Sequence, residues 1–338
     1  MQLRNLGRTG LKVSPLCLGA MMFGDQTQEA DAARIVDRAR EAGVNFIDTA
    51  DVYAAGRSEE IVGRAVKADR DRWVIATKVG NLVGPAGGRS GPDLSRKYVM
   101  KAVDDSLRRL GTDYIDLYYL HRDVHDTPLD ETVRTLGDLM RQGKIRYVGL
   151  SNFRGWRIAE FVRVCDELGV ERPAALQPLY NAMNRMAENE MLPACEHYGI
   201  GVVPYSPLAR GVLTGKYASV DAPPEGSRAA RKDTRILQTE FRAESIALAR
   251  AIHEHASARG TTAAHLAVNW VLNNKLVSSV IGGPRTMEQW DDYLAALNDA
   301  FGAEDEALVD ELVARGHPST PGFTDPAYPV LGRVALKR

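Results

Sequence analysis

Cysteine is scarce in this chain. The 338 residues contain three, Cys17, Cys165 and Cys195, an odd number without the spacing of a metal site. This usage excludes a disulfide framework and favours a reducing compartment, so we expect a cytoplasmic protein. The opening MQLRNLGRTG lacks the apolar core of a signal peptide, and no uninterrupted apolar run approaches a membrane span. We therefore expect no membrane association.

An excess of either charge is also missing. Lys and Arg number 43 against 44 Asp and Glu, which leaves a formal net charge of -1. Such a balance does not favour a polyanionic partner, so we expect no binding to nucleic acid. The hydrophobic share of 44% is ordinary for a globular protein, and the length allows one large α/β domain or two smaller ones.

A repeating unit is present instead. An apolar strand, a polar loop and an amphipathic helix recur, and a glycine placed to cap the helix C-terminus precedes the next strand. These glycines are Gly43, Gly111, Gly143, Gly169 and Gly199. The expected strands are residues 16–20, 44–48, 73–78, 115–120, 145–150, 174–177, 201–205 and 277–282.

Eight strands alternating with helices predict an α/β fold, a (β/α)8 TIM barrel, with an N-terminal β-hairpin in residues 2–17. The competing doubly wound sheet would carry a G-x-G-x-x-G turn after an early strand, and the sequence has none. We expect one domain over residues 1–338, with the barrel at about 16–315 and a tail at 316–338.

Three segments are longer than ordinary connections. They are residues 81–93, 206–238 and 317–338. The first two follow C-terminal strand ends, where barrel active sites form, so we interpret them as lids or cofactor clamps. In the third, Phe323 and Tyr328 either close the barrel mouth over a substrate or belong to a strap on the exterior.

Four reactive side chains stand at or after strand ends. In NFIDTADVY, Asp48 ends the second strand and Tyr53 follows in the loop, while Lys78 and His121 end the third and fourth strands. Singly, each has an ordinary structural role, and the four-residue spacing of His121 and His125 suggests a metal pair without an evident third ligand. Together they predict a metal-free catalytic site at the C-terminal rim of the barrel.

These four groups suit the reduction of a carbonyl. A phenol titrates near 10, and a neighbouring ammonium held by a carboxylate lowers that value. Tyr53 could then protonate the oxygen of the carbonyl while an imidazole orients it. Because no side chain carries a hydride, the reaction requires a nicotinamide.

The motifs resemble those of the aldo-keto reductases. FIDTADVY, ATK and LYYLH match the Asp-Tyr-Lys-His tetrad of that family, and GKIRYVGLSN, QPLYN, PYSPLARGVLTGKY and IGGPRTMEQ extend the resemblance to about Leu294. The most similar branch contains aryl-alcohol dehydrogenases, aflatoxin aldehyde reductases and potassium-channel β-subunits. The resemblance implies a (β/α)8 reductase that uses NADPH/NADP+ and a small-molecule carbonyl or alcohol substrate.

The resemblance also implies cofactor contacts. It assigns Ala20, Met21 and Asp48 to the lining, Ser151, Asn152 and Gln177 to the carboxamide, Tyr205 to the nicotinamide face, Ser206, Pro207, Leu208, Gly211, Lys216 and Arg228 to the pyrophosphate, and Gly283, Arg285 and Gln289 to the adenosine phosphate. Local alternatives exist, because Ser151 and Asn152 could cap a helix, and Thr286 and Gln289 are spaced as a capping box. Asp292 and Tyr293 stand where the family usually has Glu-Asn.

The leading hypothesis is an NADPH-dependent oxidoreductase that reduces aldehydes or ketones, with Tyr53 as general acid. One alternative is a cofactor-binding, redox-sensing regulatory subunit of the channel-β type. The other is a cofactor-free barrel isomerase or lyase in which Tyr53 and Lys78 act as acid and base.

Overall fold

The computed structural model describes residues 1–81 and 92–329. Most of the expected lid at 81–93, and the tail beyond residue 329, lie outside the described residues. The strands are β1 (Arg4–Asn5), β2 (Lys12–Val13), β3 (Leu16–Gly19), β4 (Phe46–Asp48), β5 (Val74–Val79), β6 (Ile115–Leu120), β7 (Ile145–Ser151), β8 (Ala175–Gln177), β9 (Gly201–Val202) and β10 (Val280–Gly282).

The α-helices are α1 (Glu29–Glu41), α2 (Arg57–Val66), α3 (Arg96–Leu110), α4 (Leu129–Arg141), α5 (Gly155–Leu168), α6 (Met191–Tyr198), α7 (Thr234–Gln238), α8 (Ala243–Ala258), α9 (Ala263–Leu272), α10 (Met287–Ala296) and α11 (Ala303–Leu312). Four short 3-10 segments complete the list: η1 (Tyr53–Gly56), η2 (Lys67–Arg72), η3 (Met186–Glu188) and η4 (Ala209–Thr214).

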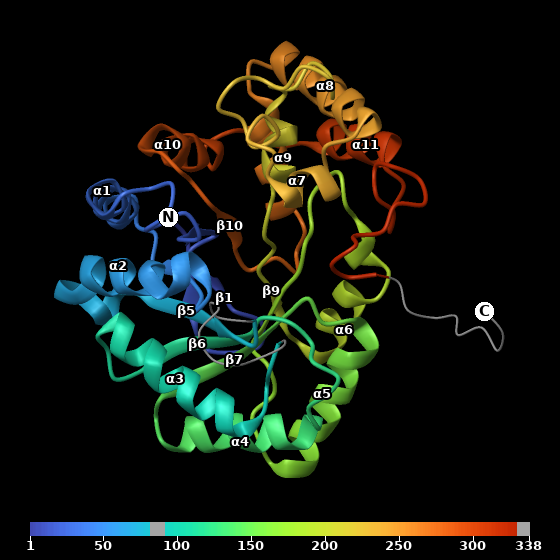
Figure 1. Cartoon of the computed structure of the whole chain (residues 1–338). Coiled ribbons are helices and arrows are strands. Elements are labelled where there is room, and N and C mark those ends of the chain that lie inside the picture. The colour runs from blue at the N-terminus through green and yellow to red at the C-terminus, as the bar shows by residue number, and fades with distance from the viewer. Residues whose placement is uncertain (82–91, 330–338) are drawn as a thin grey trace, which may run out of the picture.

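Parallel strands form the centre of the molecule, in the order β10-β3-β4-β5-β6-β7-β8-β9 (Figure 1). The two edges meet through a parallel bridge between Val202 and Val277, and the amide of Ser278 donates to the carbonyl of Val202 at 2.9 Å. The (β/α)8 barrel is therefore confirmed. Several strands are shorter than predicted, and β9 ends before Pro204, which has no N–H to donate to a ladder.

Alternation along the strands separates two apolar clusters. In β6, Leu117 and Tyr119 belong to the cluster inside the barrel, whereas Tyr118 and Leu120 pack in the larger cluster beneath the helices. Neighbouring helices contact one another in chain order from α1 to α6, and α10 contacts both α9 and α1. This ring of helices is the outer layer in Figure 1 and covers the sides of the barrel. A site can therefore form only at the ends of the strands.

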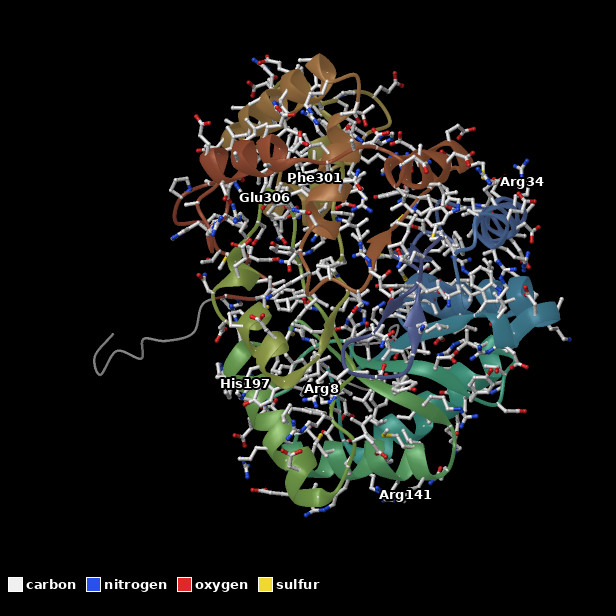
Figure 2. All side chains as sticks on the ribbon, turned by 180° about the vertical axis from the view of Figure 1, so that it is seen from behind. Arg8, Arg34, Arg141, His197, Phe301 and Glu306 are labelled. Atoms are coloured by element: carbon white, nitrogen blue, oxygen red, sulfur yellow. The ribbon has the colours of Figure 1, made fainter. Side chains whose placement is uncertain are left out.

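The N-terminal hairpin closes one end of the barrel. β1 and β2 pair antiparallel, as predicted, and Leu6 between them is part of the interior cluster. A Cβ on Gly7 would lie 2.5 Å from the amide nitrogen of Gly201, at the start of β9, so only glycine allows this approach. Figure 2 shows the reverse side, with Arg8 of the hairpin inside the ring and Arg141 at its rim. The opposite end, where the strands terminate, is therefore the end available to a ligand.

Helix ends follow local sequence in most cases. All five predicted capping glycines have positive φ. At the other end of the helices, Pro128 directly precedes α4 and Gly56 directly precedes α2. Ser58 is the second residue of α2, and its hydroxyl donates to the carbonyl of Ala20, the residue after β3. Within the described part of the chain, no helix is both long enough and apolar enough to span a membrane.

Candidate active site

A cavity of about 470 Å³ opens at the C-terminal ends of the strands. Most of the sequence-predicted site residues line it: Met21, Asp48, Tyr53, His121, Ser151, Asn152, Gln177, Tyr205, Ser206, Pro207, Leu208, Gly211, Lys216, Arg228, Gly283, Arg285 and Gln289. Lys78 lies beneath this lining, fully buried. The topology thus brings together groups that are up to 268 positions apart in the chain, from Met21 to Gln289.

The reactive centre is built around Lys78. Its ammonium donates to Asp48, to the carbonyl of Thr49 at 2.8 Å and to the hydroxyl of Tyr53 at 3.2 Å. The ring of His121 meets that of Tyr53 edge-on, with centroids 5.9 Å apart. β4, the loop after it, β5 and the residue after β6 therefore place an acid, a phenol, an ammonium and an imidazole in one contact group.

Burial and charge set the protonation states of this group. Burial alone would lower the pKa of Lys78, but Asp48 and Tyr53 outweigh it, and the pKa of the ammonium is raised. Burial also raises the pKa of Tyr53, and Lys78 opposes this without overcoming it. The ammonium acts in the predicted direction, yet the net shift is upward, so Tyr53 holds its proton at neutral pH.

His121 is a neutral imidazole. Burial, followed by the charges of Lys78 and Arg122, lowers its pKa well below the ordinary value. Its Nδ1 has no hydrogen-bond partner among the described residues. His125 does not share a ligand with it, since that ring pairs with Asp123 at 3.2 Å. Within residues 1–81 and 92–329, no cluster of His, Cys, Asp or Glu could hold a metal ion.

The side-chain amides of Gln177 and Asn152, which the sequence assigns to the nicotinamide carboxamide, bind other groups of the site. The side chain of Gln177 donates to the second oxygen of Asp48 at 2.8 Å, so it orients the carboxylate that binds Lys78. Asn152, with φ of 60°, donates to the carbonyl of His121 at 3.0 Å and accepts from the hydroxyl of Tyr205 at 2.9 Å. The capping alternative for Asn152 is wrong, because its amide makes these contacts instead.

Ala20 is an exception among the predicted residues. Its side chain is fully buried and is not part of the cavity lining. Its amide donates to the carbonyl of Asp48 at 2.8 Å, and its carbonyl accepts from Ser58 at 2.7 Å. The structure therefore places Ala20 beside the cavity lining rather than in it. Its neighbour Met21 lines the cavity and is 40% exposed.

The far end of the cavity is cationic. Lys216, Arg228 and Arg285 line it, and none of them forms an ion pair within the described residues. Burial, together with the other cations, lowers the pKa of each. Asp233 opposes the lowered pKa of Arg228 without overcoming it. Three partly buried cations that form no ion pair with a carboxylate favour an anionic ligand, because such a ligand would offset both their desolvation and their repulsion.

Gln289 has a local role at this end. Its side-chain oxygen accepts from the amide of Arg285 at 2.8 Å, and its own amide donates to the Thr286 hydroxyl at 3.4 Å. Thr286 is thus the N-cap of α10, as the capping alternative proposed. Asp292 and Tyr293, left outside the predicted site because they depart from the family pattern, also line the cavity.

Sequence reasoning missed several lining residues, including Arg210, Asp233 and Arg235. All three lie in the segment 206–238, which borders the cavity as expected for a lid or clamp. Arg210 pairs with the buried Glu240 at 2.9 Å. The arginine-rich composition of this segment was an available signal, but only the fold shows which of its arginines face the cavity.

The tail divides between the two roles that the sequence left open. Tyr328 lines the cavity, whereas the ring of Phe323 lies against Arg242, 3.6 Å from its centroid, and is not part of the lining. Asp325 makes a two-pronged ion pair with Arg235, with distances of 3.0 and 2.7 Å. One part of the tail therefore borders the site and another packs outside it.

The fold and the site define a class: a (β/α)8 barrel whose strand ends hold an acid, a phenol, an ammonium and an imidazole beside a cationic cavity. A sequence model of the Aldo/keto reductase family matches residues 15–314. The chain belongs to this family and is an oxidoreductase by that membership, with a nicotinamide as its general cofactor class.

Relatives of several kinds are similar to the chain over most of their lengths. A probable voltage-gated potassium channel subunit beta of Oryza sativa subsp. japonica is 37% identical, covering 93% of this chain and 96% of the relative. The uncharacterized oxidoreductase YrpG of Bacillus subtilis (strain 168) is 34% identical over 97% of this chain and 99% of its own. The L-glyceraldehyde 3-phosphate reductase of Escherichia coli (strain K12) is 33% identical, covering 94% and 93%.

Proposed function

We propose that this protein reduces an aldehyde or ketone with NADPH and that Tyr53 is the general acid. The observation that carries the proposal is the position of the Tyr53 hydroxyl, 3.2 Å from the Lys78 ammonium and on the wall of the cavity. Alcohol oxidation in the reverse direction with NADP+ would use the same groups, because a proton donor in one direction is the acceptor in the other.

The chain supplies the proton and the orientation. A neutral His121 can donate a hydrogen bond to the carbonyl oxygen of the substrate. This bond orients the carbonyl group so that its carbon can accept a hydride. When bound, the reduced nicotinamide supplies a hydride to that carbon. The oxygen then takes its proton from Tyr53, and the Lys78 ammonium beside the resulting phenolate stabilises the negative charge until solvent returns a proton.

The choice of NADPH rests on the cations. Lys216, Arg228 and Arg285 fit an anionic ligand, and a 2′-phosphate is an anion that NADH lacks. Ser206, with φ of 58°, and Gly211, with φ of 94°, adopt left-handed backbone in the segment before these cations, and both residues line the same cavity. A cofactor-free isomerase would leave these cations without a counter-charge.

The test is a panel of aldehydes and ketones incubated with protein and NADPH, with absorbance at 340 nm as the readout. Tyr53→Phe should lower turnover by about 10²–10⁴-fold, the usual worth of a general acid. Binding of NADPH, measured by fluorescence, should survive in the variant. Equal turnover by the variant and the wild type would refute the role of Tyr53.

A second candidate is the redox-sensing regulatory subunit of the channel-β type, considered because several relatives are named as potassium channel beta subunits. It shares the cofactor site but requires little turnover. Tight NADPH binding with no consumption on any carbonyl would favour this candidate over the reductase.

A further inference from the structure

The turn that carries Tyr53 is unusual in its backbone. Immediately after Tyr53, Ala54, Ala55 and Gly56 have φ of 48°, 55° and 93°. Left-handed backbone costs about 1–2 kcal/mol for each residue other than glycine. This conformation therefore persists only because contacts around the turn hold it.

One contact comes from α3. A Cβ on Gly56 would lie 2.7 Å from Cδ of Arg109, so the stem of Arg109 packs directly against the turn. The guanidinium of Arg109 donates to Oε2 of Glu59 at 2.6 Å. Arg109 is 18% exposed and Glu59 is fully buried, which shields the pair from water.

The other oxygen of Glu59 reaches the strand that carries Lys78. Oε1 accepts from the hydroxyl of Thr77 at 2.6 Å, and Thr77 directly precedes Lys78 in β5. One buried carboxylate therefore joins two structures: the turn after Tyr53, through Arg109, and the end of β5, through Thr77. The distance between the Tyr53 hydroxyl and the Lys78 ammonium depends on how these two structures sit relative to each other.

We propose that Glu59 is a positioning residue for proton transfer: through Arg109 and Thr77, it fixes the Tyr53 hydroxyl beside the Lys78 ammonium. Glu59 does not line the cavity, so it acts through Arg109 and Thr77. Its effect is on the placement of the Tyr53 hydroxyl relative to the Lys78 ammonium. The inference rests on the proposed function only in its expected effect on turnover.

The experiment compares three variants. Glu59→Gln removes the charge that holds Arg109, and Thr77→Val removes the other arm while keeping the shape of the side chain. Glu60→Gln is the matched control, because Glu60 is the next residue of the same helix, is less buried, and makes no hydrogen bond or ion pair among the described contacts.

Glu59→Gln should lower kcat on the order of 10- to 100-fold, since small misplacements of a reacting group have this effect. Its Kd for NADPH should stay within about twofold of the wild type, because Glu59 does not line the cavity and makes no contact with Lys216, Arg228 or Arg285 among the described residues. The high-pH limb of kcat should move upward, because Tyr53 loses the stabilising ammonium. Thr77→Val should change kcat in the same direction, and the double variant should lose less than the product of the two single losses.

A second readout does not need activity. Hydrogen exchange followed by mass spectrometry should show faster exchange in peptides covering residues 49–57 in Glu59→Gln, with Glu60→Gln unchanged. Faster exchange in Glu59→Gln, together with a wild type that reduces no carbonyl, would refute the proposed function and leave the positioning contact standing. Unchanged exchange, or loss of thermal stability in Glu59→Gln with kcat and its pH profile unchanged, would overturn the inference.

Discussion

Asp51 gives the sharpest test of how burial of a carboxyl group makes the stability of this barrel depend on pH. The residue is 2% exposed, two positions before Tyr53, and burial, followed by the charge of Glu59, raises its pKa to about 7. Arg109 on α3 opposes this shift, the Tyr98 hydroxyl lies 3.4 Å from Oδ2, and Tyr118 of β6 is the other titratable group that faces it. Oδ1 has no partner among the described residues.

The sign follows from proton uptake. The folded chain binds this proton more tightly than the unfolded chain, whose Asp51 titrates near 3.8. Below pH 3.8 the carboxyl is protonated in both states and does not reduce the free energy of unfolding. As pH rises toward 7, the free energy of unfolding falls by about 1.4 kcal/mol per unit, reaching a total cost of about 4 kcal/mol that stays constant at higher pH.

Asp51→Asn removes the ionisation and keeps an oxygen for Tyr98. Its free energy of unfolding, relative to wild type, should therefore rise by about 3 kcal/mol between pH 5 and pH 8. Urea denaturation followed by tryptophan fluorescence measures this difference, and comparing the two pH values cancels any constant effect of the amide.

Asp113→Asn is the control, because Asp113 is exposed and solvent hydrates it in both states. It should follow the wild-type pH dependence. Were Asp51→Asn to differ from wild type by the same amount at both pH values, or to be relatively weaker at pH 8, the buried carboxyl would not carry a proton and the reasoning would fail.

Three further changes test the site. Lys78→Met should raise the pKa of Tyr53 and move the high-pH limb of kcat upward, while the unpaired Asp48 costs about 3–5 kcal/mol of stability; a pH profile like that of the wild type would contradict this. Arg285→Ala should reduce the preference for NADPH over NADH by about 10- to 100-fold, as expected from one charge-assisted hydrogen bond, and an unchanged ratio of the two Kd values would argue against a 2′-phosphate contact. Asp325→Asn should free the tail that holds Tyr328 and raise KM for the carbonyl without changing Kd for NADPH, whereas unchanged kinetics would leave the tail as an outer strap.

Local sequence was sufficient for the elements of the barrel. Strand β6 is recognisable in IDLYYL as a nearly continuous apolar run, which is typical of a parallel strand buried on both faces. Capping glycines mark helix ends for the same reason, since the backbone at Gly111 depends on its own residue and its immediate neighbours. The four reactive groups were found because each stands at or after the end of an apolar strand.

What the sequence left undecided depends on packing between distant segments. That Gln177 binds Asp48, or that Ser58 donates to the carbonyl of Ala20, follows from the register of neighbouring strands and the placement of α2. The sequence also predicted that Lys78 lowers the pKa of Tyr53, but it could not weigh this against burial, which is the larger effect.

The sequence by itself determined the helices and strands, their order and the reactive residues at the strand ends. These features depend on the spacing of apolar residues and on immediate neighbours in the chain. Only the tertiary structure decided which carboxylates are buried and what they bind. Glu59 and Glu60 are adjacent and chemically identical, yet only Glu59 joins Arg109 to Thr77. The difference arises from the direction in which α2 faces β5 and α3, a long-range property that no local pattern contains.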